Sequence, residues 1–194
     1  MRKRKSSARR KTKETSIAIE MCIDGQGKYA ISTQVPFLTH MLEQISKHSL
    51  IDLKIKATGD AEIDAHHITE DIGITLGDAI QDAIGDKKGM KRFGFAYGVM
   101  DEALARVALD FSGRPYLSFN LKLAKKRIGN FDTELVEEFF QGFSRGAKMT
   151  LHIDGIKGAN THHSIEAVFK GFALAMRDAL GVQGKGLPST KGSL

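Results

Sequence analysis

Residues 66–85 (HHITEDIGITLGDAIQDAIG) are echoed 96 residues later by residues 162–181 (HHSIEAVFKGFALAMRDALG). The two stretches align without a gap, and they share both histidines, the glutamate four positions after the first histidine, and the final glycine. Each stretch has the pattern of a helix that stops at its glycine. The chain is therefore interpreted as a tandem duplication, and four of its seven histidines lie in these two pairs.

The spacing His-His-x-x-Glu is typical of a metal-binding helix end. Residues four apart share a helix face, so His66 and Glu70 point the same way, while His67 points about 100° aside. Such a helix end can supply ligands to two different metal ions. Imidazole with one carboxylate suits Mn, Zn, Fe or Co better than Ca or Mg. The corresponding residues of the second copy are His162, His163 and Glu166. Paired histidines can also be plain polar residues at a helix start, but two pairs in register favour metal binding.

Composition limits the class of protein. The 194 residues, 41% of them hydrophobic, fit one compact unit or two fused halves of about 95 residues. No apolar run approaches the roughly 18 residues that a membrane span needs, so we expect no membrane contact. The charged N-terminus lacks the apolar segment of a secretory signal. Cys22 is the only cysteine, which excludes an intramolecular disulfide and favours a cytoplasmic location.

The net charge of +6 is concentrated at the N-terminus. Residues 1–13 hold eight of the 29 lysines and arginines and no acid, which leaves 21 basic against 23 acidic residues elsewhere. Residues 1–12 are therefore predicted to be a basic tail. Such a tail can bind nucleic acid, be merely solvated, or fold over an anionic site. The sequence has no recognition-helix signature, no zinc-finger spacing and no aromatic-basic platform, so we expect no nucleic-acid partner.

Hydrophobic periodicity predicts the same order of elements in both halves. In the first half, strands at 15–23 and 28–33 form a hairpin around the turn at 24–27, and a helix (37–48), a strand (50–57) and the His-His helix follow. In the second half, strands at 107–111 and 116–123 precede a helix (133–143), a strand (149–153) and the second His-His helix. This order predicts an α+β fold in which each half is a mixed or antiparallel sheet with helices packed on one face.

The predicted domain limits follow from this order. They are a basic tail at 1–12, a first repeat at 13–90, a second repeat at 91–182 and a C-terminal substrate-binding tail at 183–194. The middle helices also align, residues 37–44 with 135–142, at an offset of 98. His40 then falls opposite Glu138, and both side chains can ligate a metal.

An ordered series of short motifs runs through the chain after residue 10. They are Thr12-Lys13-Glu14-Thr15, His40-Met41-Leu42-Glu43-Gln44 with His48, Asp64-Ala65-His66-His67 through Glu70-Asp71, Arg92-Phe93-Gly94, Met100-Asp101-Glu102-Ala103-Leu104, Ser112-Gly113-Arg114-Pro115, His162-His163 through Lys170, and Pro188-Ser189-Thr190-Lys191-Gly192. Any one alone is a weak signal, but the ordered set resembles the imidazoleglycerol-phosphate dehydratase family of histidine biosynthesis. The resemblance implies halves with a ribosomal protein S5 domain 2-like fold.

The resemblance also implies two Mn²⁺ ions per active site and a homo-oligomer of 24 subunits with sites between subunits. The ligands that it implies are His40, His66, His67, Glu70, Glu138, His162, His163 and Glu166. Many relatives have histidine at position 138, so His152 is the alternative ligand to Glu138. Thr39 replaces a usual aspartate that would orient His40, and Gln34 replaces a usual glycine.

The implied reaction converts D-erythro-imidazole-glycerol phosphate to imidazole-acetol phosphate and water. A metal on the substrate imidazole favours the imidazolate, which can expel the adjacent hydroxyl to give a diazafulvene and acidify the neighbouring C–H. The resemblance identifies Glu14 as the acid/base group. Glu70 and Glu166 are further catalytic candidates, although we expect them to act as ligands.

The resemblance assigns substrate binding to charged and polar residues in both halves. Arginine suits bidentate contact with phosphate, and lysine acts as a point charge. Gln44 and His48 share a helical face with His40, as substrate contacts would. The full set is Glu14, Gln44, His48, Arg92, Arg114, Lys170, Ser189 and Lys191.

Two other functions fit parts of the sequence. A different two-metal enzyme acting on a phosphate ester is one, but such sites are usually rich in aspartate, whereas histidine dominates here. A metal-sensing or nucleic-acid-binding protein led by the basic tail is the other. In that case, deleting residues 1–10 should abolish function and spare the metal sites.

Overall fold

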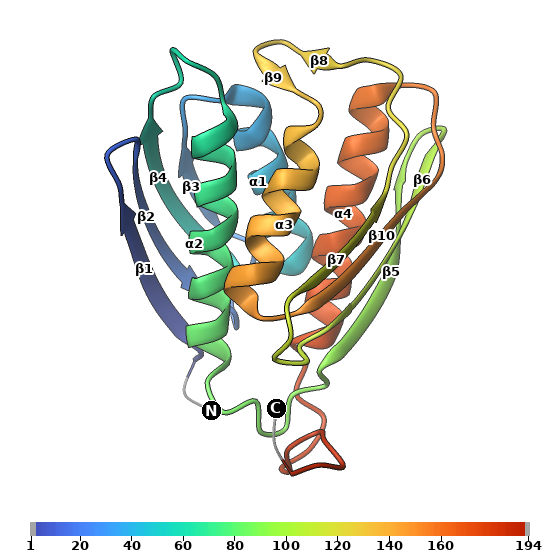
Figure 1. Cartoon of the computed structure of the whole chain (residues 1–194). Helices are drawn as coiled ribbons and strands as arrows, with labels where there is room; N and C mark the ends of the chain where they lie inside the picture. Colours follow the sequence, from blue (N-terminus) through green and yellow to red (C-terminus); the bar gives the residue numbers. More distant parts are fainter. Residues whose placement is uncertain (1–2, 193–194) are drawn as a thin grey trace.

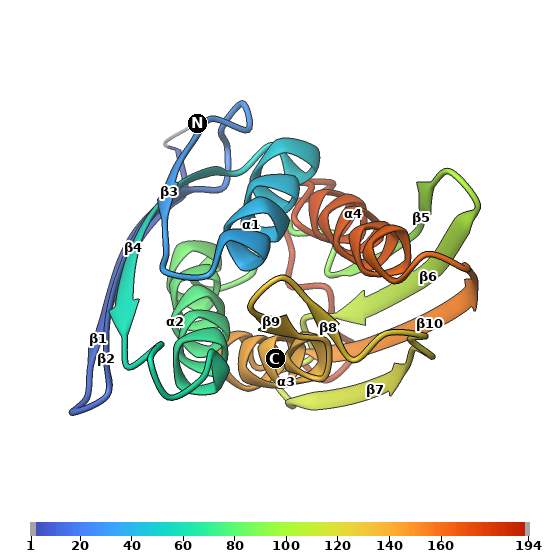
Figure 2. The ribbon, with the colours of Figure 1, turned by 90° about the horizontal axis from the view of Figure 1, so that it is seen from above.

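The computed structural model describes residues 3–192, which form two four-stranded sheets on either side of a layer of helices. Seen from above, the sheets stand at opposite sides and the four helices fill the space between them (Figure 2). The first half contains β1 (Lys5–Lys11), β2 (Thr15–Cys22), β3 (Tyr29–Ser32), α1 (Pro36–Ser49), β4 (Asp52–Gly59) and α2 (His66–Ile84). The second contains β5 (Phe93–Met100), β6 (Ala103–Asp110), β7 (Tyr116–Asn120), a small ribbon of β8 (Arg127–Ile128) and β9 (Phe131–Asp132), α3 (Leu135–Ala147), β10 (Thr150–Lys157) and α4 (Thr161–Ala179).

The two sheets have the same topology, which confirms the predicted duplication. Their strand orders are β1-β2-β4-β3 and β5-β6-β10-β7. In each sheet the first three strands pair antiparallel, and the last strand pairs parallel to the third. Each sheet is therefore mixed, with helices on one face, as the sequence pattern predicted.

Buried serines repeat the 98-residue offset at the level of side chains. Ser46 Oγ donates to the Ile51 carbonyl at 2.6 Å, and Ser144 Oγ donates to the Met149 carbonyl at 2.7 Å. The residues that end α1 and α3, Leu50 and Lys148, are both left-handed. This match supports aligning α1 with α3, which places His40 and Glu138 in equivalent positions.

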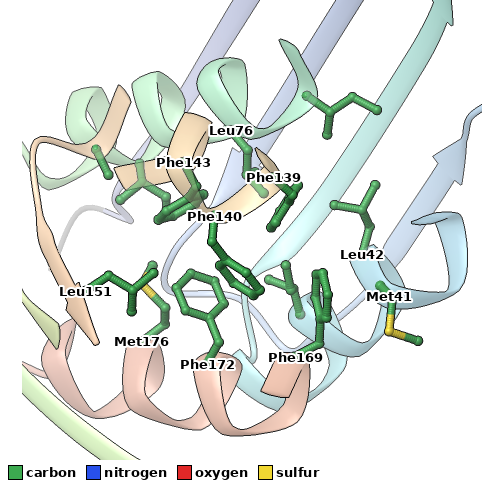
Figure 3. Packing of buried hydrophobic residues seen from close by; sticks show 14 of the residues in the cluster. Met41, Leu42, Leu76, Phe139, Phe140, Phe143, Leu151, Phe169, Phe172 and Met176 are labelled. Atoms are coloured by element: carbon green, nitrogen blue, oxygen red, sulfur yellow. The ribbon is translucent and has the colours of Figure 1, made fainter. Parts of the chain in front are cut away.

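The helices pack across the two halves. α2 lies against α3, and α1 lies against α4 (Figures 1 and 2). The α2–α3 contact is close because Gly73 and Gly77 of α2 meet backbone atoms of α3, where an added Cβ would collide. Figure 3 shows Phe139, Phe140 and Phe143 of α3 beside Phe169 and Phe172 of α4. The buried apolar residues of both halves form one core, so a site between paired helices draws on both halves.

The prediction of a basic tail is wrong for residues 5–11, which form the edge strand β1. Its side chains alternate between exposed and half-buried, and the half-buried set faces α2. Ser6 Oγ donates to the Ala79 carbonyl at 2.7 Å, and Arg10 Nε donates to Asp71 Oδ1 at 2.6 Å. Edge strands are often rich in charge because charge discourages pairing with other chains. Residues 1–2 of the predicted tail, and 193–194 of the C-terminal tail, lie outside the described residues.

Arg10→Ala is therefore expected to lower the melting temperature. The buried Asp71 carboxylate would lose one partner, although Thr15 still donates to it at 2.5 Å. We expect the free energy of unfolding to fall by about 1.5 kcal/mol. This is the low end for a hydrogen bond to a charged group, because the Arg10 side chain is 40% exposed. Thermal unfolding measures it, with the exposed neighbour Arg9→Ala as control. Equal melting temperatures for the two variants would contradict a structural role for Arg10.

The predicted hairpin between the strands at 15–23 and 28–33, which correspond to β2 and β3, is also wrong. β3 pairs in parallel with β4, and β2 pairs with β1 and β4. Both edges of β2 are occupied, so β3 has to add to the sheet at the far side of β4. Parallel strands need a crossover connection, and α1 supplies it. In the second half the prediction also missed β5, the counterpart of β1.

Within residues 3–192, none of the helices combines the length and apolar character that a membrane span requires.

Candidate metal centre and substrate site

The first cluster of donors lies between α1 and α4 and is called the α1/α4 group, comprising His40, His162 and Glu166. One ligand atom from each lies within 4.8 Å of the others. Glu166 Oε2 is 3.2 Å from His162 Nε2 and 3.6 Å from His40 Nε2. Phe37 packs edge-on against the His162 ring at 5.2 Å. The sequence predicted all three donors, but their gathering across the two halves follows from helix pairing.

The Glu166 carboxylate is buried and charged. Burial alone would raise its pKa, but the hydrogen bond and charge of Lys170, together with His40 and His162, lower the pKa of Glu166 below its ordinary value. Lys170 Nζ donates to Glu166 Oε1 at 2.7 Å. Oε2 is thus left facing the imidazoles, which is the arrangement that a metal ligand needs.

The residues that correspond to these donors in the other helix pair are His66, Glu70 and Glu138, here called the α2/α3 group. Among the described residues, only the α1/α4 donors converge within 4.8 Å. His66 Nε2 is 3.9 Å from Glu70 Oε2, and Arg145 donates to Glu70 Oε1 at 3.2 Å. Each group therefore holds one carboxylate oxygen with a cation and turns the other toward an imidazole. Glu138 lies one turn before Gly142, which meets the Glu70 carbonyl, so it is on the side of α3 that faces α2. The Glu70 side chain is 28% exposed, whereas that of Glu166 is 8% exposed.

The second histidine of each pair points away from these groups, as its helical position predicted. His67 Nδ1 lies 2.9 Å from Asp60 Oδ2 and 3.9 Å from Glu14 Oε2. His163 Nδ1 lies 2.8 Å from Glu102 Oε2. The hydrogen bond to Asp60 raises the pKa of His67. The hydrogen bond between His163 and Glu102 raises the pKa of His163 and lowers that of Glu102 to about 2.

The α1/α4 group has two imidazoles and one carboxylate, and the α2/α3 group has one imidazole and two carboxylates. Both combinations of donors fit Mn²⁺ and other borderline divalent ions. The sequence proposed His152 as an alternative to Glu138. In the structure His152 is exposed on β10, between the core residues Leu151 and Ile153, with its ring 5.7 Å from that of Tyr116. It lies on the face of the sheet opposite the helices and joins neither group.

The predicted substrate residues fall into two sets. The first set lies beside the α1/α4 group: His48 Nε2 is 3.1 Å from Gln44 Oε1. Burial, followed by the charge of Lys170, lowers the pKa of His48. Glu14 belongs to the same end of the molecule, in the turn between β1 and β2, with a side chain 55% exposed.

The second set is called the distal group, comprising Arg92, Arg114, Ser189 and Lys191. Arg92 N donates to the carbonyl of Ala179, the last residue of α4, and its guanidinium donates to Asp110 and to the Pro188 carbonyl. α4 carries His162 near its other end, about 26 Å away at 1.5 Å per residue. Figure 1 shows the C-terminal segment at the opposite end of the helices from the starts of α2 and α4.

Asp60 and Glu102 had no predicted role. Glu102 lies in one of the short motifs, but no contact was assigned to it, and Asp60 lies outside all of them. Their contacts with the histidines depend on loop positions that no spacing in the sequence reports. Asp60 precedes the first His-His helix by six residues, but Glu102 lies 60 residues before the second, so no common signal in the sequence marks the two.

Fold and site together define a duplicated α+β protein in which imidazole and carboxylate side chains, the donors that metal-dependent enzymes use, lie at one end of paired helices. Comparison with known proteins gives the family. The family model described as imidazoleglycerol-phosphate dehydratase matches residues 33–176. The chain belongs to the imidazoleglycerol-phosphate dehydratase family.

Relatives match along their whole length. An imidazoleglycerol-phosphate dehydratase of Teredinibacter turnerae is 53% identical, over 100% of both chains. That of Bordetella pertussis is 55% identical, over 95% of this chain and 96% of the relative. The Staphylococcus aureus crystal structure has 48% identity and a TM-score of 0.81, covering 91% of this chain and 99% of the other. The Pyrococcus furiosus enzyme, solved with (S)-C348, has 40% identity and a TM-score of 0.82, covering 96% and 99%.

Proposed function

We propose that two Mn²⁺ ions, held with the help of the α1/α4 and α2/α3 groups, serve the dehydration reaction of this enzyme. The reaction itself follows from family membership: the chain is a hydro-lyase that removes water from imidazole glycerol phosphate in histidine biosynthesis. The observation that carries the metal proposal is the convergence of His40, His162 and Glu166 within 4.8 Å. Bound metal would polarise the substrate imidazole and the leaving hydroxyl.

Glu14 is proposed to move the proton at the substrate carbon. Its carboxylate lies 3.9 Å from His67 Nδ1 and is 55% exposed, so a substrate at the metal-facing end can reach it. Glu70 and Glu166 each have one oxygen held by a cation and the other near an imidazole. That arrangement suits ligands better than proton carriers. Among the described donors, Glu138 fits the α2/α3 group better than His152 does.

The separation of the two substrate sets supports a site shared between subunits. In the substrate a three-carbon chain joins imidazole to phosphate, far too short to span the length of α4. One chain therefore cannot present both its α1/α4 group and its distal group to one substrate molecule. A neighbouring copy would supply the distal group to bind phosphate, consistent with the proposed 24-subunit assembly. A cytoplasmic location is also proposed, because Cys22 is the only cysteine and a reducing compartment suits such a chain.

Metal removal tests this proposal. Treatment with a chelator is expected to abolish formation of the ketone product from imidazole glycerol phosphate, and added Mn²⁺ should restore it. Elemental analysis should find about two Mn²⁺ per chain, one for each donor group. If sites lie between subunits, metal also contributes to assembly by linkage, so size-exclusion chromatography should show dissociation after chelation.

The same assay separates the alternative functions. Release of free phosphate without ketone would indicate a phosphate-ester enzyme instead. Full activity and unchanged size after complete metal removal would overturn the metal proposal, while leaving the family membership intact.

A further inference from the structure

The second histidines of the two pairs share a feature that the metal-facing groups do not explain. In both, Nδ1 lies within hydrogen-bond distance of a carboxylate from outside the helix, Asp60 for His67 and Glu102 for His163. An ionised carboxylate only accepts hydrogen bonds, so Nδ1 must carry the hydrogen. The neutral ring then has its lone pair on Nε2. Both rings are thereby held in the tautomer that can bind a metal through Nε2.

The two carboxylates come from different places in the repeat. Glu102 lies in the turn between β5 and β6, and its counterpart in the first half is the turn between β1 and β2, which carries Glu14. Asp60 instead follows β4, whose counterpart is β10. Asp60 and Glu102 therefore make the same contact from positions that are not equivalent in the two repeats. Duplication of an ancestral contact does not explain this.

We infer that Asp60 and Glu102 are positioning residues that orient His67 and His163 as metal ligands through Nδ1. The inference rests on the proposed metal sites. Carboxylates that accept from the second nitrogen of a ligating histidine fix its orientation and raise its basicity. In this chain the role is divided between two loops.

This division explains why Glu14 is available for chemistry. In the second half, the turn glutamate, Glu102, is engaged by His163 at 2.8 Å and by the N–H groups of Ala159 and Asn160. In the first half Asp60 accepts the hydrogen bond from His67 Nδ1, and Glu14 Oε2 lies 3.9 Å from the same nitrogen. The Asp60 N–H donates to the Glu14 carbonyl at 3.1 Å, so the two residues are held side by side. The duplicated turn thus has a positioning glutamate in one half and an exposed one in the other.

The hydrogen bonds predict different results for the two amide variants. Glu102 Oε1 accepts from the N–H groups of Ala159 and Asn160, so in Glu102→Gln these groups keep the amide oxygen on their side. The amide NH₂ then faces His163 Nδ1 and donates to it, which forces the hydrogen onto Nε2 and blocks metal binding there. Among the described residues no group donates to Asp60 Oδ1. The Asp60→Asn amide can therefore turn its oxygen toward His67 and keep the useful tautomer.

The experiment measures Mn²⁺ binding by titration calorimetry on chelated and reloaded full-length protein. Glu102→Gln is expected to weaken Mn²⁺ binding about 10–100-fold, and Asp60→Asn is expected to weaken it less. Glu20→Gln is the matched control, because Glu20 is exposed and pairs with Lys54 at 3.2 Å on β4. Visible spectra of Co²⁺-loaded protein report ligand geometry and should change for Glu102→Gln but not for the control. The melting temperature without metal should be the same for Glu102→Gln and wild type, which separates positioning from folding.

The outcomes distinguish the inference from the function on which it rests. Wild-type protein that binds no Mn²⁺ would remove the proposed metal sites themselves. Wild-type protein that binds Mn²⁺, with a Glu102→Gln variant of equal affinity and equal Co²⁺ spectrum, would overturn the positioning role alone. If Asp60→Asn lost as much Mn²⁺ affinity as Glu102→Gln, the predicted difference in amide orientation between the two variants would be overturned.

Discussion

The Glu14→Gln variant is expected to turn over imidazole glycerol phosphate about 10²–10⁴-fold more slowly than wild type, the usual contribution of a positioned acid/base group. The amide keeps the size and most hydrogen bonding of the carboxylate but cannot take up a proton. KM and Mn²⁺ content should change little, because Glu14 is 55% exposed and Asp60, not Glu14, holds His67. A loss confined to kcat would place the Glu14 interaction in the transition state.

Steady-state kinetics on metal-loaded protein measures this effect, with Glu20→Gln as the control for loss of an exposed carboxylate. If Glu14 were only a solvated residue of the turn, its replacement would alter stability by a few tenths of a kcal/mol and leave kcat unchanged. A kcat near the wild-type value would transfer the proton step to another group.

The helices and their repeat could be predicted from the sequence because local signals agree with the fold. The spacing of His-His-x-x-Glu and the glycine after each helix are short-range features, and α2 ends at Ile84 directly before Gly85, as predicted. The offset of 98 between α1 and α3 was also readable, and Ser46 and Ser144 confirm it in three dimensions.

Strand pairing could not be predicted in the same way. β1 reads as a run of basic residues because an edge strand has only one partner and exposes one face. Its half-buried side chains include Arg10, which pairs with Asp71 some sixty residues away in sequence. The register of β3 likewise depends on β4, which comes later in the chain. Periodicity within one strand carries no information about which strand is its neighbour.

The identity of the site residues was easier to predict than their grouping. His40 and His162 belong to different halves, and only the packing of α1 against α4 brings them together. The contacts of Glu102 and Asp60 depend on where two loops end. The separation of Arg92 from the histidines follows from the length of α4, which a list of motifs does not convey.

That separation leads to the last prediction, in which two impaired variants are expected to regain activity when they assemble together. His162→Ala removes a donor of the α1/α4 group and is expected to reduce turnover to background. Lys191→Ala removes a proposed phosphate contact of the distal group. We expect kcat/KM to fall about 10–100-fold, as for loss of a hydrogen bond to a charged group. If the two groups of one site come from different subunits, a mixed assembly contains some sites with neither lesion.

Co-expression of the two variants with different affinity tags, followed by purification through both tags, gives the mixed assembly. A random mixture in which each site draws on two subunits should have about a quarter of its sites intact, well above the activity of either parent. The control pair is His162→Ala with Glu166→Ala. Both lesions fall in the α1/α4 group, so every such group in that mixture is damaged and no recovery is expected. Activity of the His162→Ala and Lys191→Ala mixture no greater than the mean of its parents would mean that one subunit supplies both ends of the site. His162 and Ala179 are 17 positions apart along α4, about 26 Å at 1.5 Å per residue, which is incompatible with one subunit placing both ends on so short a substrate.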